Sequence, residues 1–269
     1  MAGLAILLKI KLPFFSLRVP EAFQVASSLP VPSPSALVGA LAYALAIHSN
    51  ISNEAALNYA RKIVLAARAT IPEAQTYTLN PILLWRFRIL DRGMERPKKK
   101  GIKLTLLQQL TALTNEGRYS EAKTLLELKL KDALYREYIF APEVKVVYLV
   151  KEKVDTEIFK LISRLGDTES LCSVIEVKTH SYELVSVDKV ETTFPFVYTD
   201  KVSEIKGDFM IMKQSNELRE LKLFVIPITR RILTTKRGGK VTTLWPSKLK
   251  VSFKDFINVA KVNNEYIVV

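Results

Sequence analysis

LPVPSPSALVGALAYALAI, residues 29–47, is the stretch that decides the fold, because it joins a proline-rich loop to a fully apolar segment. Ser33 is the expected N-cap of a helix, and Pro34 suits its first position, where a missing N–H costs little. Residues 36–47 are apolar on every side, which is typical of a helix buried in a protein core. We therefore expect the neighbouring segments to pack around this helix.

The segments on either side of this helix predict two strands and a second helix. Residues 4–12 (LAILLKIKL) form a mostly apolar run that begins to alternate, as expected of a buried strand. Residues 13–34 are rich in proline and predict a rigid, extended loop. After the apolar helix, Asn53 is the expected cap of a helix that runs to about Arg68, and residues 79–90 predict the second strand.

The next part of the chain repeats this pattern after a long interruption. Residues 104–114 and 120–138 predict two helices, and residues 144–150 predict a strand. A helix capped by Asp155 and ended by Gly166 comes next. Residues 171–177 predict another strand. The order strand, helix, strand, strand, helix, strand predicts an α+β, ferredoxin-like (RRM-like, βαββαβ) domain over residues 1–178. An insertion at about 85–138 would lie between its second and third strands.

Residues 179–269 contain several short alternating runs, which predict a small, mostly β C-terminal domain. The runs are residues 182–187, 209–212, 221–228 and 231–244. Gly238-Gly239 interrupts the last run and predicts a hairpin turn there.

The charge balance indicates a polyanionic partner. The 269 residues include 40 Lys+Arg and 27 Asp+Glu, a formal net charge of +13. Such an excess attracts nucleic acid, although a lysine-rich background can produce it without any partner.

Cysteine and histidine are too scarce for a disulfide framework or for most zinc sites, so we expect no metal and no cofactor. The longest apolar run, residues 36–47, is shorter than the roughly 20 residues of a membrane span. Residues 1–11 also lack the features of a signal peptide. We expect a cytoplasmic protein without a membrane partner.

Motifs of catalysis are missing from the sequence. It contains no Gly-rich phosphate loop ending in Gly-Lys-Ser/Thr, no His-Glu-x-x-His, no Cys-x-x-Cys and no Gly-x-Ser-x-Gly. His48 ends the apolar helix, where a histidine interacts favourably with the helix dipole, and His180 lies in a strand connection. The sequence therefore predicts a protein that is not an enzyme.

Three basic segments are candidates for RNA binding. Five cations crowd the loop that follows the strand at residues 79–90, where aromatic Trp85 and Phe87 alternate with arginines and could stack on bases. The alternatives are a solvated loop and core aromatic residues. A second segment flanks Gly238-Gly239, and a third is the glycine loop at residues 164–170, which could also be a simple helix stop. The predicted RNA-binding residues are Arg18, Ser33, Ser35, Arg86, Arg88, Arg92, Arg96, Lys98, Lys99, Lys100, Arg164, Gly166, Arg230, Arg231, Lys236 and Arg237.

Two motifs resemble those of a known family. Phe14-Phe15-Ser16-Leu17-Arg18 with the stretch LPVPSPSALVGAL is similar to the N-terminal signature of the CRISPR-associated Cas-five family of the RAMP superfamily. Arg164-Leu165-Gly166 with Ser170-Leu171-Cys172-Ser173-Val174 resembles its second motif, a glycine loop before the fourth strand. The resemblance covers about residues 1–177, and the first motif is most similar to archaeal type I-A members.

The resemblance implies a non-catalytic subunit of a type I CRISPR Cascade complex, which acts in antiviral defence. Such a subunit binds the 5′ handle of the guide RNA, caps the backbone filament and contacts the large subunit, with target DNA as a further possible partner in the complex. The insertion at about 85–138 takes the position of the family's basic hairpin, called the thumb, and is longer and more helical.

Two other functions stay open. One branch of the family cleaves precursor RNA with a tyrosine, a lysine and a histidine, so a metal-independent endoribonuclease that processes repeat RNA is the alternative. The insertion contains no histidine, and RNA cleavage by acid–base catalysis normally needs a group that titrates near neutrality. A basic protein that binds an acidic protein partner is the third possibility.

Overall fold

The computed structural model describes residues 3–21, 25–87, 106–127, 131–167, 169–236 and 238–269. The chain divides into two compact units, one comprising Met1–Pro81 with Glu137–Val269 and the other Ile82–Arg136. Within the described ranges, no helix is long and apolar enough to span a membrane.

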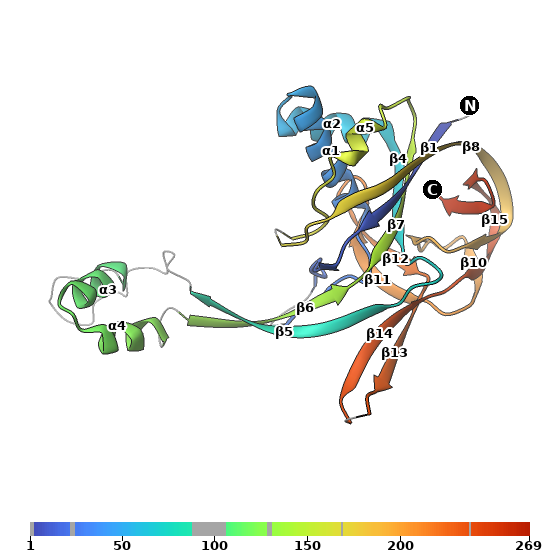
Figure 1. The fold of residues 1–269 in the computed structure, drawn as a ribbon. Coiled ribbons are helices and arrows are strands. Elements are labelled where there is room, and N and C mark those ends of the chain that lie inside the picture. Colours follow the sequence, from blue (N-terminus) through green and yellow to red (C-terminus); the bar gives the residue numbers. More distant parts are fainter. Residues whose placement is uncertain (1–2, 22–24, 88–105, 128–130, 168, 237) are drawn as a thin grey trace. The chain divides into compact units, whose positions relative to one another are not determined.

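The larger unit is built on an antiparallel sheet in which the first strand is central (Figure 1). β1 (Gly3–Lys11) lies between β7 (Glu143–Val150) and β8 (Ser173–Thr192), and β4 (Val64–Thr70) pairs with the other edge of β7. These four strands therefore have the order β8-β1-β7-β4. The buried positions of β1 alternate towards its C-terminal end, as its sequence predicts.

β8 is a single strand of 20 residues that continues through residue 178. β15 (Leu249–Val262) pairs antiparallel with it, and β10 (Val202–Lys206) and β16 (Glu265–Val268) pair with the other edge of β15. C-terminal strands thus extend the N-terminal sheet, and the expected boundary between residues 1–178 and 179–269 falls inside one strand.

Helix α1 (Pro34–Ser49) forms as its sequence predicts. Ser33 Oγ accepts a hydrogen bond from Ala36 N (3.4 Å), and Pro34 lies in the first turn. Leu37 is fully buried, and its carbonyl accepts a hydrogen bond from Tyr148 Oη of β7 (2.9 Å). This bond ties the helix to the centre of the sheet.

Helix α2 (Asn53–Ile63) is shorter than predicted, and the difference changes the identity of the second strand. Its N-cap is Ser52, one residue before the expected Asn53. The chain becomes extended at Val64 instead of remaining helical to Arg68, because residues 64–70 pair with β7 as β4. The prediction that residues 79–90 form the second strand of this sheet is therefore wrong.

The last predicted helix is reduced to about one turn, α5 (Glu157–Lys160). The N-cap is Thr156, one residue after the expected Asp155, although Asp155 Oδ1 accepts a hydrogen bond from Glu157 N (3.0 Å). The ring centroid of Phe159 lies 5.3 Å from that of Tyr148 in β7. α1, α2 and α5 gather on one side of the sheet (Figure 1).

A second sheet has the order β13-β14-β5-β6-β2, and a two-residue strand, β3, pairs with β6. β6 replaces the end of the helix predicted over residues 120–138, since α4 (Tyr119–Leu125) stops early. Residues 135–140 (YREYIF) include aromatic and β-branched side chains, which favour a strand once a partner is available. The bounds are β13 (Ile228–Thr234), β14 (Lys240–Pro246), β5 (Tyr77–Phe87), β6 (Lys131–Phe140), β2 (Phe14–Phe15) and β3 (Val25–Ala26).

The hairpin formed by β13 and β14 confirms the predicted turn. Thr235 N donates to the Gly239 carbonyl (2.7 Å), and Gly238 N donates to the Thr235 carbonyl (2.9 Å). Gly238 has a φ of +78°, a conformation that favours glycine. The hairpin projects from the rest of the larger unit (Figure 1).

In the described part of the smaller unit, helices α3 (Leu106–Asn115) and α4 are joined by a turn at Gly117 with a φ of +71°. Arg118 pairs with Glu116 (2.8 Å) and with Glu121 (2.6 Å) across this turn. The helix predicted over residues 104–114 is present.

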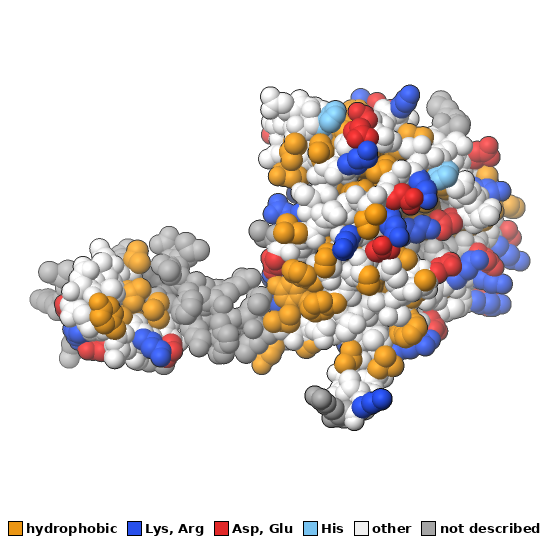
Figure 2. Space-filling model, viewed as in Figure 1, with side chains coloured by type: hydrophobic (Ala, Val, Ile, Leu, Met, Phe, Trp, Pro, Cys, Tyr) orange, Lys and Arg blue, Asp and Glu red, His pale blue; other side chains and the backbone are white. Residues whose placement is uncertain are grey.

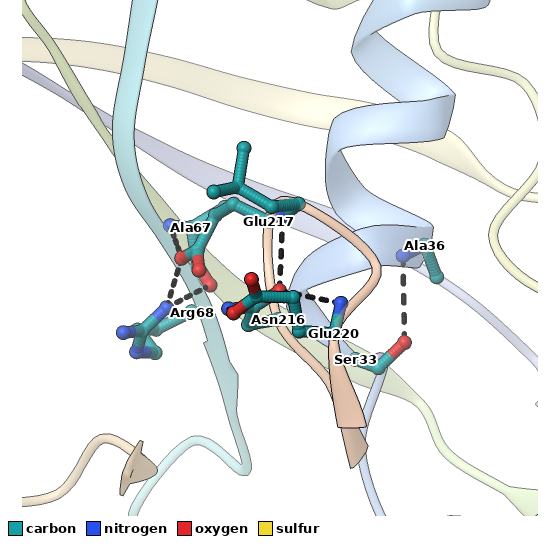
Figure 3. Close-up of polar contacts among 8 residues, drawn as sticks. Ser33, Ala36, Ala67, Arg68, Asn216, Glu217 and Glu220 are labelled. Carbon is teal, nitrogen blue, oxygen red and sulfur yellow. Dashed lines mark hydrogen bonds and ion pairs between the residues drawn. The ribbon is translucent and has the colours of Figure 1, made fainter. Parts of the chain in front are cut away.

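A third sheet has the order β11-β12-β9, with β11 (Met210–Ser215), β12 (Leu221–Ile226) and β9 (Phe196–Val197). The turn between β11 and β12 is clamped onto β4 (Figure 3). Glu217 Oε1 accepts hydrogen bonds from Ala67 N (2.9 Å) and from the guanidinium of Arg68, which is 3% exposed. Asn216 Oδ1 shapes the turn by accepting from Glu220 N (2.9 Å). The clamp covers the edge of β4, which pairs on its other side with β7.

Candidate nucleic-acid interface

The two motifs that lie about 150 residues apart in sequence meet in the larger unit. We call this contact, made by residues 14–18 and 164–170, the glycine-loop junction. Asp167 N donates to the Ser16 carbonyl (3.3 Å), and Ser16 N donates to Ser170 Oγ (3.3 Å). Gly166 has a φ of +118°, and a Cβ there would lie 3.1 Å from Ser16 O. Glycine is therefore required by both the backbone conformation and the available space.

Further hydrogen bonds extend the junction to neighbouring strands. Leu17 N donates to Ser28 Oγ (3.0 Å), and Ser28 N donates to Glu137 Oε2 (3.0 Å). Tyr138 Oη donates to Glu169 Oε1 (2.7 Å). Sequence reasoning missed this network, since none of its side chains stands out in the sequence by type or spacing.

The junction contains buried serines, which hold it together, and exposed arginines, which a ligand can reach. Ser16 and Ser170 are fully buried, so their hydrogen bonds hold the two segments together. Arg18 and Arg164 are exposed, and each lies on one of the two segments. Arg18 forms an isolated β-bridge with Ser28, and Arg164 forms one with Leu171. The junction thus carries two exposed arginines on a fixed frame that also contains the acidic Asp167 and Glu169.

Ser33 and Ser35, predicted as neutral donors, lie at the start of α1. Ser33 is 5% exposed, and its hydroxyl accepts a hydrogen bond from Ala36 N (Figure 3). Ser33 Oγ also lies 3.2 Å from Ser35 Oγ. The Ser33 hydroxyl is therefore engaged by the helix start, while Ser35 is half-buried.

Arg230 and Arg231 project to opposite faces of the β13–β14 hairpin, as successive residues of a strand must. Arg230 pairs in register with Leu244 and lines a pocket of about 320 Å³ that also includes Ser28 and Glu137. The guanidinium of Arg231 lies 5.1 Å from the ring centroid of Trp245. The structure therefore brings Arg230, but not Arg231, to the pocket that includes Ser28, whose hydroxyl accepts a hydrogen bond from Leu17 N of the junction.

For most of the remaining predicted cations, the side chain or the whole residue lies outside the described part of the structure. Lys236 is exposed in the hairpin turn. Arg86 belongs to β5, but its side chain is outside the described set. Arg88, Arg92, Arg96, Lys98, Lys99, Lys100 and Arg237 lie outside the described residues.

An exposed aromatic group lies beside the junction. Phe14 is 38% exposed, and its ring centroid lies 6.1 Å from that of Tyr138 and 6.3 Å from that of Phe140. Figure 2 shows hydrophobic side chains gathered on the part of the surface where β2 and the end of β6 lie in Figure 1. Alternation along Phe14-Phe15 could have predicted this pair, because the buried Phe15 leaves Phe14 on the other face.

One titratable group beside the second motif, the Cys172 thiol, is affected by burial. Cys172 N donates to the Ser163 carbonyl (2.9 Å), and burial raises the pKa of the Cys172 thiol to about 12. His48 Nε2 lies 3.8 Å from Asp155 Oδ2. In the part of the chain that the structure describes, no group of three or more His, Cys, Asp and Glu side chains could hold a metal ion.

Comparison with known proteins identifies the family. The family described as "CRISPR-associated protein (Cas_Cas5)" matches residues 5–168. These residues include the whole of the first motif and the Arg164-Leu165-Gly166 part of the second. The chain belongs to the CRISPR-associated Cas5 family. This confirms the family resemblance inferred from the two motifs.

Two relatives and one solved structure show how far the likeness extends. The Cas5 protein of Thermoproteus tenax is 28% identical over 234 residues, which are 87% of this chain and 89% of the relative. The Cas5 protein of Methanocaldococcus jannaschii is 28% identical over 187 residues, 65% and 63% of the respective chains. A CRISPR protein from Archaeoglobus fulgidus shares the fold, with a TM-score of 0.58 and 16% identity over 98% of both chains.

The Cas5 match also divides the candidate residues into two groups. Arg18, Ser33, Ser35, Arg164 and Gly166 lie within it, together with the basic loop of the insertion. The hairpin cations lie beyond residue 168. The junction is therefore a feature of the family region, whereas the hairpin belongs to the C-terminal strands of this chain.

Proposed function

We propose that this chain is a non-catalytic subunit of a type I CRISPR Cascade complex. In this proposal it binds the 5′ handle of the guide RNA and caps the backbone filament, in antiviral defence. Family membership supports the CRISPR role. The glycine-loop junction is the observation that carries RNA binding, since it holds Arg18 and Arg164 on a frame fixed by backbone hydrogen bonds.

The chemistry of the junction suits the end of a single-stranded RNA. Exposed arginines contact phosphates without reading sequence, and a rigid frame sets the path of the strand. Arg230 adds a cation at the pocket that includes Ser28, and Phe14 offers an aromatic ring on which an unpaired base can stack. The formal net charge of +13 attracts RNA to this surface.

The strand arrangement supports a ferredoxin-like core for this module. The strands occur in the chain as β1, β4, β7 and β8, and their order in the sheet is β8-β1-β7-β4 with antiparallel neighbours. Two strand–helix–strand units that interleave in this way give the RRM-like arrangement common to RNA-binding domains. The segment between β4 and β7 then takes the place of the thumb.

The partners in this proposal are the guide RNA and the backbone and large subunits, with target DNA as a further ligand of the assembled complex. An exposed apolar group formed by Phe140 and Ile175, which line one pocket, suits a contact with a neighbouring subunit. A complex that carries guide RNA would act in the cytoplasm.

Fluorescence anisotropy with two guide RNAs of the same composition tests the proposal. One RNA carries the repeat-derived handle at its 5′ end and the other at its 3′ end. We expect the full chain to bind the first roughly tenfold more tightly, a difference of about 1.4 kcal/mol. The variant Arg18→Ala/Arg164→Ala should lose this preference, whereas Arg219→Ala/Lys222→Ala, with the same change in charge, should keep it. Equal affinity of the unaltered chain for both RNAs would contradict handle binding.

The non-catalytic part of the proposal has its own test. The insertion contains no histidine, which argues against acid–base cleavage of RNA near neutral pH. Incubation of the full chain with repeat RNA in EDTA should leave the RNA intact. Cleavage at one defined position would establish the alternative, a metal-independent endoribonuclease.

A further inference from the structure

A second basic surface lies on the C-terminal strands, and it shares no lining residue with the pocket that includes Arg230. It is a groove of about 590 Å³ on β8, β10 and β15. We call it the lysine groove, after Lys189, Lys206, Lys248 and Lys250, which line it together with Glu191, Glu204, Ser252, Asn264 and Tyr266. Figure 2 shows basic side chains, with acidic ones among them, on the side of the molecule where β10 and β15 lie.

Two positive charges lie opposite each other in the groove, which is unfavourable for the sheet when no ligand is bound. Lys206 of β10 is the register partner of Lys250 of β15, and their side chains are 68% and 71% exposed. Like charges directly opposite each other on neighbouring strands destabilise a sheet. An anion bound between the two lysines would remove this repulsion.

The carboxylates in the groove offset only part of its positive charge. Glu191 is shared, with its oxygens 2.7 Å from Lys248 Nζ and 3.2 Å from Lys250 Nζ, and these two partners lower the pKa of its carboxyl. Glu204 lies 3.3 Å from Lys206 Nζ. Four lysines thus line the groove with two carboxylates, and Glu73 also interacts with Lys248, which leaves a surplus of one positive charge among these groups.

Neutral side chains complete the groove with groups suited to nucleotides. Ser252 is the register partner of both Lys189 and Glu204, so it lies at the centre of the three strands. The Tyr266 carbonyl accepts a hydrogen bond from Thr192 Oγ1 (2.7 Å), which fixes the backbone that carries its ring. Tyrosine can stack on a base, and asparagine and serine can donate to phosphate or to base edges.

We propose that the lysine groove binds the backbone of a single-stranded nucleic acid at a site separate from the guide-handle site. The groove shares no residue with the pocket lined by Arg230, and it lies beyond the family match at residues 5–168. Its volume falls in the range of pockets that hold small ligands, which is enough for a nucleotide unit. The aromatic ring and the amide beside the lysines favour a nucleic acid over an acidic peptide.

Paired variants of the full chain test this site. Lys206→Ala/Lys250→Ala removes the opposed pair, and both side chains are exposed, so folding should be unaffected. Lys178→Ala/Lys222→Ala is the matched control, because it removes the same charge from exposed lysines outside the groove. The probe is a fluorescein-labelled 20-nucleotide oligouridylate, which contains no handle, titrated at several salt concentrations.

The groove variant should bind roughly 25-fold more weakly at 0.1 M salt, with the slope of log K against log salt reduced by about 1.4, as two lost phosphate contacts require. The control should leave the slope nearly unchanged. Tyr266→Leu should also weaken binding, while Tyr266→Phe should not. Equal losses in the groove variant and the control would overturn the proposal, because only overall charge would then matter. A groove variant that loses affinity for a labelled polyglutamate peptide but not for the oligouridylate would assign the site to an acidic protein segment instead.

Discussion

The glycine-loop junction and the β13–β14 hairpin both carry arginines proposed to bind RNA, but the two regions are built differently. The junction is made of buried hydroxyls, backbone amides and a glycine that accepts no Cβ. The hairpin is a pair of strands that presents exposed cations, among them Arg230, Arg231 and Lys236. We infer that the junction sets the geometry of a bound strand and that the hairpin contributes attraction. Changes to the buried frame of the junction should therefore alter stability, and changes to the exposed arginines of the junction or the hairpin should alter affinity.

Thiol labelling should show the largest contrast between the two regions. Cys172 follows the junction, and burial raises the pKa of its thiol to about 12. At pH 8 its thiolate fraction, and hence its rate of alkylation by iodoacetamide, should be roughly a thousandfold below that of an ordinary thiol. The rate should keep rising tenfold per pH unit beyond pH 9, where an exposed thiol levels off. A Thr235→Cys variant supplies the exposed thiol in the hairpin turn, and similar rates at both positions would mean that the junction opens readily.

Gly166→Ala should cause the next largest effect, on stability. The residue has a φ of +118°, and the new Cβ would press on the Ser16 carbonyl. We expect a loss of about 2–3 kcal/mol, seen in thermal unfolding as a fall in Tm of roughly 5–10 °C. Gly117→Ala is the control, because it has a φ of +71° with nothing within 4 Å and should cost only about 1 kcal/mol. Equal losses would show that packing at the junction contributes nothing.

Ser170→Ala should destabilise the chain less. The substitution removes the acceptor of the buried Ser16 amide, which costs about 1–2 kcal/mol when no other partner replaces it. Chemical denaturation with urea measures this change. Ser181→Ala, at an exposed position of β8, should leave the midpoint unchanged. An unchanged midpoint for Ser170→Ala would mean that this bond is not needed to hold the loop.

Arg230→Ala should have the smallest effect and should change affinity only. Loss of one phosphate contact lowers the slope of log K against log salt by about 0.7, or roughly fivefold in affinity at 0.1 M salt. Arg231→Ala is the natural comparison, since Arg231 lies on the other face beside Trp245. If only Arg231→Ala weakens guide RNA binding, the hairpin presents the opposite face to the RNA.

Single residues with a strong backbone preference were enough to predict the start of a helix and the position of a turn. The start of α1 follows from Ser33 and Pro34, and the hairpin turn follows from Gly238. β4 was missed because VLAARAT, residues 64–70, carries alanine and arginine that suit a helix, and only pairing with β7 makes it a strand. Residues 249–262 were not predicted at all, although they form the long strand β15.

The sequence supplied candidate residues for the site, which stay a prediction, but it did not supply their geometry. Gly166 stood out as a glycine in a polar loop, yet nothing in the sequence places it against Ser16. Alternation places Arg230 and Arg231 on opposite faces once their strand is known, but choosing the face that meets Ser28 requires the tertiary structure. The basic loop at Lys98, Lys99 and Lys100 lies outside the described residues and stays a prediction.

The continuity of β8 has a consequence for how this chain can change in length. From Glu176 to Val187 the strand keeps continuous pairing, first with β1 and then with β15. Inserting one residue there would turn every later side chain to the opposite face and disrupt the distal end, including Glu191. Evolution can therefore lengthen this segment only two residues at a time or by adding a new bulge. Alignments of distant homologues through it should favour gaps of even length.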